Sequence, residues 1–146
     1  ELVANYGNWF NIPFAIAYFY NVYGEREIST GKYATLIALF LDKRKNNKKL
    51  TVVSPGTQRR NFTHIKDIIS GLILIGENGY GDDFGIGSQE SYTILEVAEM
   101  FGGNIVMLPE RKGNRMVADV VIEKTVKLGW LPKESLKDYI RQVNGI

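Results

Sequence analysis

The sequence predicts a mixed fold, α/β or α+β, because short apolar segments typical of strands alternate with segments of helical periodicity. Two further observations indicate how many domains the chain forms. The 146 residues suffice for one sizeable core, and no interior linker divides them. We therefore expect residues 1–146 to form a single region without repeats, with about four or five short strands in a modest sheet.

The first half of the chain has clear element signals. An apolar face at three-to-four-residue spacing predicts a helix over residues 1–10, and residues 14–19 are suited to a buried strand. Residues 21–24 are expected to form a loop. A helix over residues 32–45, capped by Ser29 or Thr30, and a strand over residues 50–53 follow.

The second half continues the alternation of strands and helices. Thr93 and Glu96 have the spacing of a capping box at the start of a helix that runs through Phe101. The other expected elements are strands over residues 62–64, 83–87 and 104–108, and helices over residues 66–76, 122–128 and 133–143.

Composition excludes several classes of function. The chain has no cysteine and one histidine, which rules out disulfides and thiolate chemistry and argues against a metal site. A net charge of +2 is too small to imply a nucleic-acid or membrane partner, and no apolar run is long enough to span a bilayer. No signal peptide is visible, so we expect a cytoplasmic protein. The chain starts at Glu1 inside an expected helix, which favours a fragment.

Adjacent arginines give the strongest functional signal. Arg59 and Arg60 follow a Pro-Gly turn, and a guanidinium group suits a phosphate because its planar fork gives two charge-assisted hydrogen bonds. On a strand the two side chains point to opposite faces, so one of them is expected to reach a given ligand. Arg111 could supply a second phosphate contact. Ordinary surface salt bridges for the pair, and a solvated basic loop around Arg111, are the alternatives.

Other polar and aromatic residues have plainer interpretations. We expect His64 to be a satisfied structural residue and Asp67 to be a helix-start residue that complements the helix dipole. The basic run over residues 43–49 is expected to be a solvated helix C-terminus. The aromatic residues around Asn21 form either a buried wall or the wall of a site for a planar ring. Residues 85–88 lack the third glycine of a dinucleotide loop, and no complete catalytic constellation is present.

Five segments together resemble one family in order and spacing. They are residues 20–24, 56–67, 84–88, 111–115 and 128–130. The chain resembles the C-terminal part of extended short-chain dehydrogenase/reductases, close to the NAD-dependent nucleotide-sugar epimerases and dehydratases of the UDP-glucose or UDP-N-acetylglucosamine 4-epimerase type. The resemblance implies an α/β fold: the C-terminal portion of a Rossmann-like NAD(P)-binding fold with its smaller α/β substrate-binding domain.

The resemblance also implies roles for individual residues. Arg60 and Arg111 would grip the diphosphate, and Asn21 would touch it. Thr51 to Val53 would lie along the uracil, and Asn114 stands where an acidic residue commonly contacts the ribose. Phe19 and Tyr20 would lie near the nicotinamide.

The family's glycine-rich NAD motif and its catalytic Tyr-x-x-x-Lys are absent from these 146 residues. We therefore expect a substrate-binding part that is inactive alone, with no catalytic residue of its own, from a homodimeric parent that uses NAD on a UDP-linked sugar. A stand-alone, non-catalytic nucleotide-binding or regulatory module is the alternative.

Overall fold

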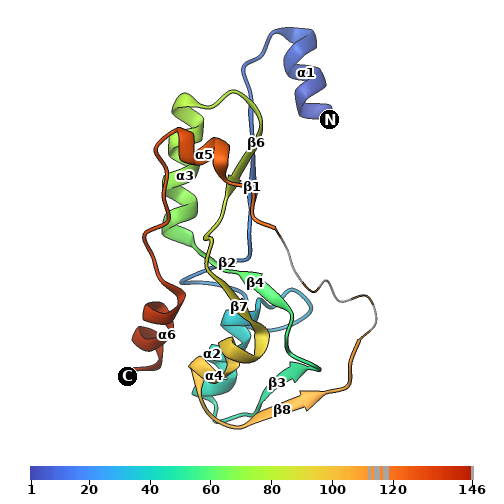
Figure 1. Ribbon diagram of the computed structural model, residues 1–146, viewed down its shortest axis with the longest axis vertical. Helices are drawn as coiled ribbons and strands as arrows, with labels where there is room; N and C mark the ends of the chain where they lie inside the picture. Colours follow the sequence, from blue (N-terminus) through green and yellow to red (C-terminus); the bar gives the residue numbers. More distant parts are fainter. Residues whose placement is uncertain (112, 114–115, 117–118, 146) are drawn as a thin grey trace.

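The computed structural model describes residues 1–111, 113, 116 and 119–145 (Figure 1). Helices and strands alternate along these residues, as expected. The helices are α1 (Leu2–Phe10), α2 (Leu36–Lys45), α3 (Ile65–Asn78), α4 (Ile94–Phe101), α5 (Glu123–Lys127) and α6 (Leu136–Asn144). The strands are β1 (Ala15–Phe19), β2 (Val22–Tyr23), β3 (Leu50–Val53), β4 (Arg59–Asn61), β5 (Thr63–His64), β6 (Gly81–Ile86), β7 (Ser91–Thr93) and β8 (Ile105–Leu108).

The strands of the described segments pair two by two. β1 pairs with β6, β2 with β5 and β3 with β8, all parallel, whereas β4 and β7 are antiparallel. The expectation of one modest sheet is therefore wrong for this part of the chain. Each parallel pair joins segments far apart in sequence, so the partners cannot be read from local pattern.

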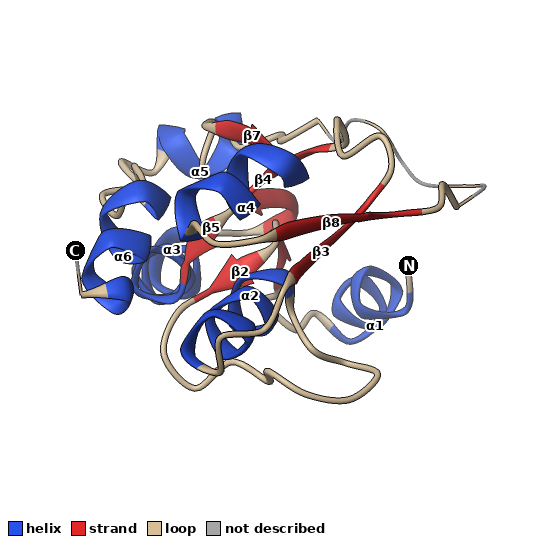
Figure 2. Cartoon of the chain, turned by 90° about the horizontal axis from the view of Figure 1, so that it is seen from below, coloured by secondary structure: helices blue, strands red, loops and turns tan. Residues whose placement is uncertain are grey.

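Two apolar cores divide the molecule into an upper and a lower lobe (Figure 1). In the upper lobe α3 and α5 pack against the β1–β6 pair. In the lower lobe α2, α4 and the β3–β8 pair lie together, with α6 beside them (Figure 2). The buried members of the upper core are Ile68, Ile75, Phe84, Ile86, Ile122 and Trp130.

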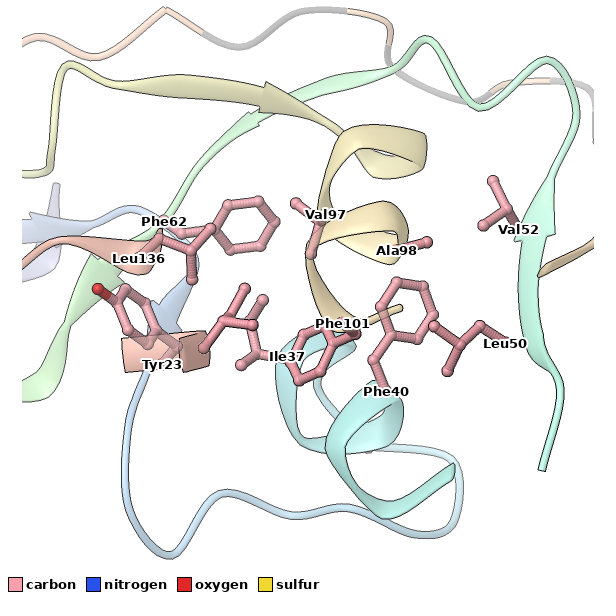
Figure 3. Close-up of a cluster of buried hydrophobic side chains, with 11 residues drawn as sticks. Tyr23, Ile37, Phe40, Leu50, Val52, Phe62, Val97, Ala98, Phe101 and Leu136 are labelled. Atoms are coloured by element: carbon pink, nitrogen blue, oxygen red, sulfur yellow. The ribbon is translucent and has the colours of Figure 1, made fainter. Parts of the chain in front are cut away.

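The lower core lies mainly between α2 and α4 (Figure 3). Phe40 of α2 and Phe101 of α4 are both fully buried, and their rings meet edge to face with centroids 5.9 Å apart. Leu50 and Val52 of β3 cover one end of this ring pair, and Tyr23 lies at the other end of the core (Figure 3). The lower lobe therefore has a continuous interior of its own.

Asp67 ties the first turn of α3 to the segment that leads into α6. Its Oδ1 accepts a hydrogen bond from the backbone N–H of Lys133, and its Oδ2 accepts one from Glu134, both at 3.0 Å. The indole N–H of Trp130 donates to the Asp67 carbonyl at 3.0 Å. The expectation for Asp67 is right about its place in the first helical turn. Its carboxylate, however, bonds to backbone groups of a distant segment.

Some element boundaries differ from the expectation. α2 begins at Leu36 with Thr35 as its N-cap, four residues later than predicted. Glu27 explains the shift, because its carboxylate accepts hydrogen bonds from the Gly24 N–H and the Thr35 hydroxyl and so fixes the preceding segment as a loop. Three short strands, β2, β4 and β7, lie outside the predicted strand ranges, and β2 falls in the expected loop over residues 21–24. Each has only two or three residues and is defined by its partner strand.

The predicted capping box at α4 is confirmed. The Thr93 hydroxyl accepts from the Glu96 N–H at 3.0 Å, and the Glu96 carboxylate accepts from the Thr93 N–H at 2.6 Å. These hydrogen bonds, the backbone one above all, lower the pKa of Glu96 below its ordinary value.

A lowered pKa makes the contribution of Glu96 to stability depend on pH. The contribution is fully present above the pKa of Glu96 in the unfolded chain and disappears as the pH falls through its lower pKa in the folded protein. We expect Glu96→Gln to destabilise the protein at neutral pH and to differ less from wild type as the pH falls. Urea unfolding over an acidic pH series measures this difference. Glu99→Gln, an exposed change on the same helix, is the control and should show no such trend.

Candidate functional site

A cavity of about 390 Å³ opens in the lower lobe between α2, β3, β4 and the residues that follow β8. We call it the Arg60 pocket. Its walls combine apolar side chains with a few polar ones. The lining residues are Asn21, Leu36, Leu39, Thr51, Val53, Gln58, Arg60, Phe62, Ile94, Leu108 and Arg111.

The pocket brings together most of the predicted substrate residues. Asn21, Thr51, Val53, Arg60 and Arg111 come from four separate segments of the chain, and all of them line it. Asn114, the remaining predicted residue, lies outside the described residues. The sequence-based set is therefore a spatial cluster wherever the structure describes it.

Arg60 is the arginine of the adjacent pair that lines the pocket. One of its terminal nitrogens donates to the Arg59 carbonyl at 2.7 Å, which fixes the direction of the side chain. Arg59 instead donates to the hydroxyl of Ser91 at 3.1 Å and to the Ser91 carbonyl, and it lies 3.8 Å from the Glu96 carboxylate. The predicted division of the pair between two faces is thus observed. The salt-bridge interpretation fits Arg59.

Asn21 and Thr51 are polar lining residues whose side chains have different hydrogen-bond partners. Asn21 has a left-handed backbone with φ of 38°, and its side-chain amide donates to the Asn61 carbonyl at 2.9 Å. Thr51 lies in β3, and its hydroxyl accepts from the Lys43 ammonium at 2.6 Å. Lys43, the partly buried first residue of the basic run, therefore reaches a wall of the pocket. The pocket has cationic groups near it, and none of the described residues that line it is acidic.

The two predicted cofactor residues lie outside the Arg60 pocket. Phe19 ends β1 and is half exposed. The Tyr20 ring lies against Gly85 and Gly87, and its hydroxyl accepts from the Val121 N–H at 3.2 Å. A Cβ atom at Gly85 would lie 1.7 Å from the Val121 carbonyl oxygen, so the glycine is needed for this close approach. These two glycines serve packing, which agrees with the rejection of a dinucleotide loop.

His64 has the structural role that the sequence predicts. His64 is buried, and its Nδ1 accepts from the Lys66 N–H at 3.3 Å as the N-cap of α3. Its ring packs against Tyr23 and Tyr139. Burial raises the pKa of Tyr23 far above its ordinary range, and the Asp67 carboxylate adds to the rise. Tyr23 therefore stays protonated, and this aromatic cluster is part of the core.

The described ranges contain no group of three or more potential metal ligands. Within them, no helix combines the length and the hydrophobicity needed to cross a bilayer.

Gln58 is the functional candidate that the sequence reasoning missed. It lines the pocket two residues before Arg60 and is 5% exposed. Residues two apart on an extended chain share a face, so the choice of Arg60 already carried a signal for Gln58. The apolar wall from α2 and the start of α4 was also missed, because it depends on how distant helices pack.

Comparison with known proteins identifies the family. The family model described as "NAD dependent epimerase/dehydratase family" matches residues 1–87. The chain belongs to this family. A Methanocaldococcus jannaschii protein named "Putative UDP-glucose 4-epimerase" is 28% identical over 98% of the chain and 48% of its own length. UDP-glucuronic acid decarboxylase 5 of Arabidopsis thaliana is 32% identical over 94% of the chain and 42% of its length.

Solved structures of the family have the same fold. UDP-glucose 4-epimerase of Thermotoga maritima, solved with UDP-glucose, superposes with a TM-score of 0.89 at 21% identity, over 99% of the chain and 48% of that structure. The expected Rossmann-like epimerase fold is confirmed. The chain spans about a third to a half of the length of the curated relatives that it matches.

Proposed function

We propose that the Arg60 pocket holds the diphosphate of a UDP-linked sugar in an NAD-dependent epimerase. The observation that carries the proposal is the convergence of Arg60, Arg111 and Asn21 on one pocket. The family membership supports it, and so do the names of the relatives, which refer to UDP-glucose and UDP-glucuronic acid.

The chemistry of the pocket suits this ligand. Two guanidinium groups can each offer paired N–H donors to phosphate oxygens, and Asn21 lines the same pocket. The apolar side chains of Leu36, Val53 and Leu108 suit the faces of a planar base. Together these groups would hold the nucleotide fixed while the sugar is oriented for reaction, which is catalysis by positioning.

The chain's own residues fit NAD only in part. The exposed Phe19 ring provides an aromatic edge, but the space beside Gly85 is filled by Tyr20 and Val121. When bound, NAD supplies the acceptor for the hydride of the sugar C4. We propose that the rest of the NAD site, and the Tyr-x-x-x-Lys pair, belong to a Rossmann half of the parent enzyme.

The upper lobe offers a surface on which such a half could pack. Within the described ranges β1 pairs with β6 along one edge only. Apolar side chains on α3, including Ile69 and Ile73, are at least half exposed, as are Trp9 and Phe10 on α1. Exposed apolar surface of this extent is typical of an interface. On this account the chain is inactive alone. If the chain were instead a stand-alone module, the apolar surface of α1 and α3 would remain exposed to solvent.

UDP-glucuronic acid decarboxylation is a second candidate reaction, because the Arabidopsis decarboxylase exceeds 30% identity. Both reactions would use the same diphosphate site. Incubation of the full-length parent and NAD with UDP-glucose, UDP-N-acetylglucosamine or UDP-glucuronic acid, followed by product analysis by NMR, separates them. A C4 epimer supports the first proposal, whereas a pentose product with released carbon dioxide supports the second. No turnover of any of the three favours the non-catalytic module.

Loss of either arginine should weaken binding of UDP. Each removes a charge-assisted contact worth about 1.5–3 kcal/mol, which corresponds to a roughly 10- to 150-fold increase in Kd. Isothermal titration of UDP into the Arg60→Ala and Arg111→Ala variants of the full-length parent measures the change.

Arg59→Ala is the matched control, because Arg59 is adjacent in sequence but contacts Ser91 and Glu96. It should leave the Kd for UDP within about twofold of wild type, even where it lowers stability. Equal UDP affinity in wild type and in both pocket variants would refute the proposed diphosphate site.

A further inference from the structure

The segment that leads into α2 borders the Arg60 pocket at both of its ends. Asn21, at its start, and Leu36, the first residue of α2, both line the pocket. Leu39 lines it too, because residues three apart share one face of a helix. The place where α2 begins therefore decides where one apolar wall of the pocket lies.

Glu27 bridges this segment from one side to the other. Its Oε1 accepts a hydrogen bond from the Gly24 N–H at 2.7 Å, and its Oε2 accepts one from the Thr35 hydroxyl. The Gly24 backbone lies against α3, since a Cβ atom there would be 2.6 Å from the Cγ2 atom of Ile65. The carboxylate thus joins a residue packed on α3 to the residue at which α2 starts.

Thr35 makes this bridge in place of its ordinary role. A threonine at an N-cap usually accepts a hydrogen bond from an N–H of the first helical turn. Within the described part of the chain the Thr35 side chain accepts no such bond, and its hydroxyl donates to Glu27 instead. The first turn of α2 contains no acidic residue, so Glu27 supplies from outside the helix the negative charge that complements its N-terminus.

We infer that Glu27 is a positioning residue of the Arg60 pocket, whose carboxylate holds the first turn of α2 so that Leu36 and Leu39 form the apolar wall. The inference rests on the proposed function and adds a residue that acts on the pocket from outside its lining.

The anionic part of the pocket is held by other segments. Arg60 lies on β4 and Arg111 follows β8, whereas the Glu27 bridge contacts Gly24 and Thr35. Asn21 has a hydrogen bond of its own, from its amide to the Asn61 carbonyl. Loss of the bridge is therefore expected to displace the apolar wall and to leave the arginine subsite in place.

Two ligands separate these parts of the pocket. UDP and inorganic pyrophosphate are titrated calorimetrically into wild type and Glu27→Ala. We expect the Kd for UDP to rise about tenfold or more, and the Kd for pyrophosphate, which needs the arginines only, to stay within about threefold of wild type.

Glu27→Gln is the conservative variant. Its amide oxygen can accept from the Gly24 N–H and its NH₂ can donate to the Thr35 hydroxyl, so the bridge survives without the charge. The Kd for UDP should return to within about threefold of wild type. The Leu39 N–H, which donates to the Thr35 carbonyl at 2.9 Å, should exchange faster in Glu27→Ala than the global change explains, and Glu27→Gln should restore its protection.

Thr35→Val tests the other half of the bridge without a change of side-chain shape. It should weaken UDP binding in the same direction as Glu27→Ala. Because both changes break one bridge, the double variant should bind UDP no more weakly than Glu27→Ala alone, within about twofold.

Phe84→Leu separates positioning from stability. Phe84 is buried in the upper core, so the variant lowers stability without a change in the lower lobe. It should bind UDP within about twofold of wild type.

Four results would overturn the inference while the diphosphate site stands. They are unchanged UDP affinity in Glu27→Ala, failure of Glu27→Gln to restore that affinity, equal losses for UDP and pyrophosphate, and additive losses in the double variant. A loss in Phe84→Leu as large as that in Glu27→Ala would also overturn it, because lower stability would then explain both. If wild type binds neither ligand, the proposed function fails, and the inference fails with it.

Discussion

Replacing Phe101 with alanine is expected to lower the free energy of unfolding by about 3–5 kcal/mol, the cost typical of a large buried aromatic side chain. Phe101 is fully buried, and its ring contacts Phe40 across the interface between α4 and α2 (Figure 3). The truncation removes apolar contacts and leaves a cavity that two packed helices cannot close. Urea unfolding followed by circular dichroism measures the loss.

Tyr33→Ala is the control, because it also removes an aromatic side chain, here one that is 77% exposed. It should change the free energy of unfolding by less than about 0.5 kcal/mol. A similar small effect for Phe101→Ala would mean that the lower core is not packed between α2 and α4 as described.

Replacing Asp67 with alanine is expected to have the second large effect, about 3 kcal/mol or more. The change leaves the backbone N–H groups of Lys133 and Glu134 without their acceptor, and hydrogen bonds to a charged group contribute about 1.5–3 kcal/mol each. Urea unfolding should show the loss of stability. Hydrogen exchange of the two amides should accelerate beyond the global change, because the segment before α6 loses its attachment to α3.

Asp138→Ala provides the control for Asp67, since Asp138 is an exposed residue of α6 whose partner is Arg141 in the next turn. An exposed pair of this kind contributes little, so the variant should stay within about 0.5 kcal/mol of wild type. If the two aspartate variants lost the same stability, the hydrogen bonds of Asp67 would not join the lobes as the structure indicates.

Much of the fold could be predicted because its signals are local. The apolar periodicity of α3, the Thr93–Glu96 capping box and the apolar runs of β1 and β3 depend on neighbouring residues only. The pairing of those strands does not. β3 meets β8 across more than fifty residues, and nothing in either strand specifies the other. The division into two cores follows from such pairings and was therefore invisible in the sequence.

The site shows the same division between local and distant information. Alternation along a strand separated Arg59 from Arg60, because their opposite directions follow from strand geometry alone. The convergence of Arg60 with Arg111, Asn21 and Thr51 came only from the resemblance to a family, since their segments meet through the fold. Gln58 was overlooked because its two-residue spacing from Arg60 was not followed up, and its burial is known only from the structure.

The central claim is that one pocket holds a nucleotide diphosphate between Arg60 and Arg111. A crystal structure of the protein with UDP tests it most directly. The account predicts diphosphate oxygens within hydrogen-bonding distance of both guanidinium groups, with the uracil beside β3. Density for UDP at another surface, with both arginines turned away from it, would contradict the account.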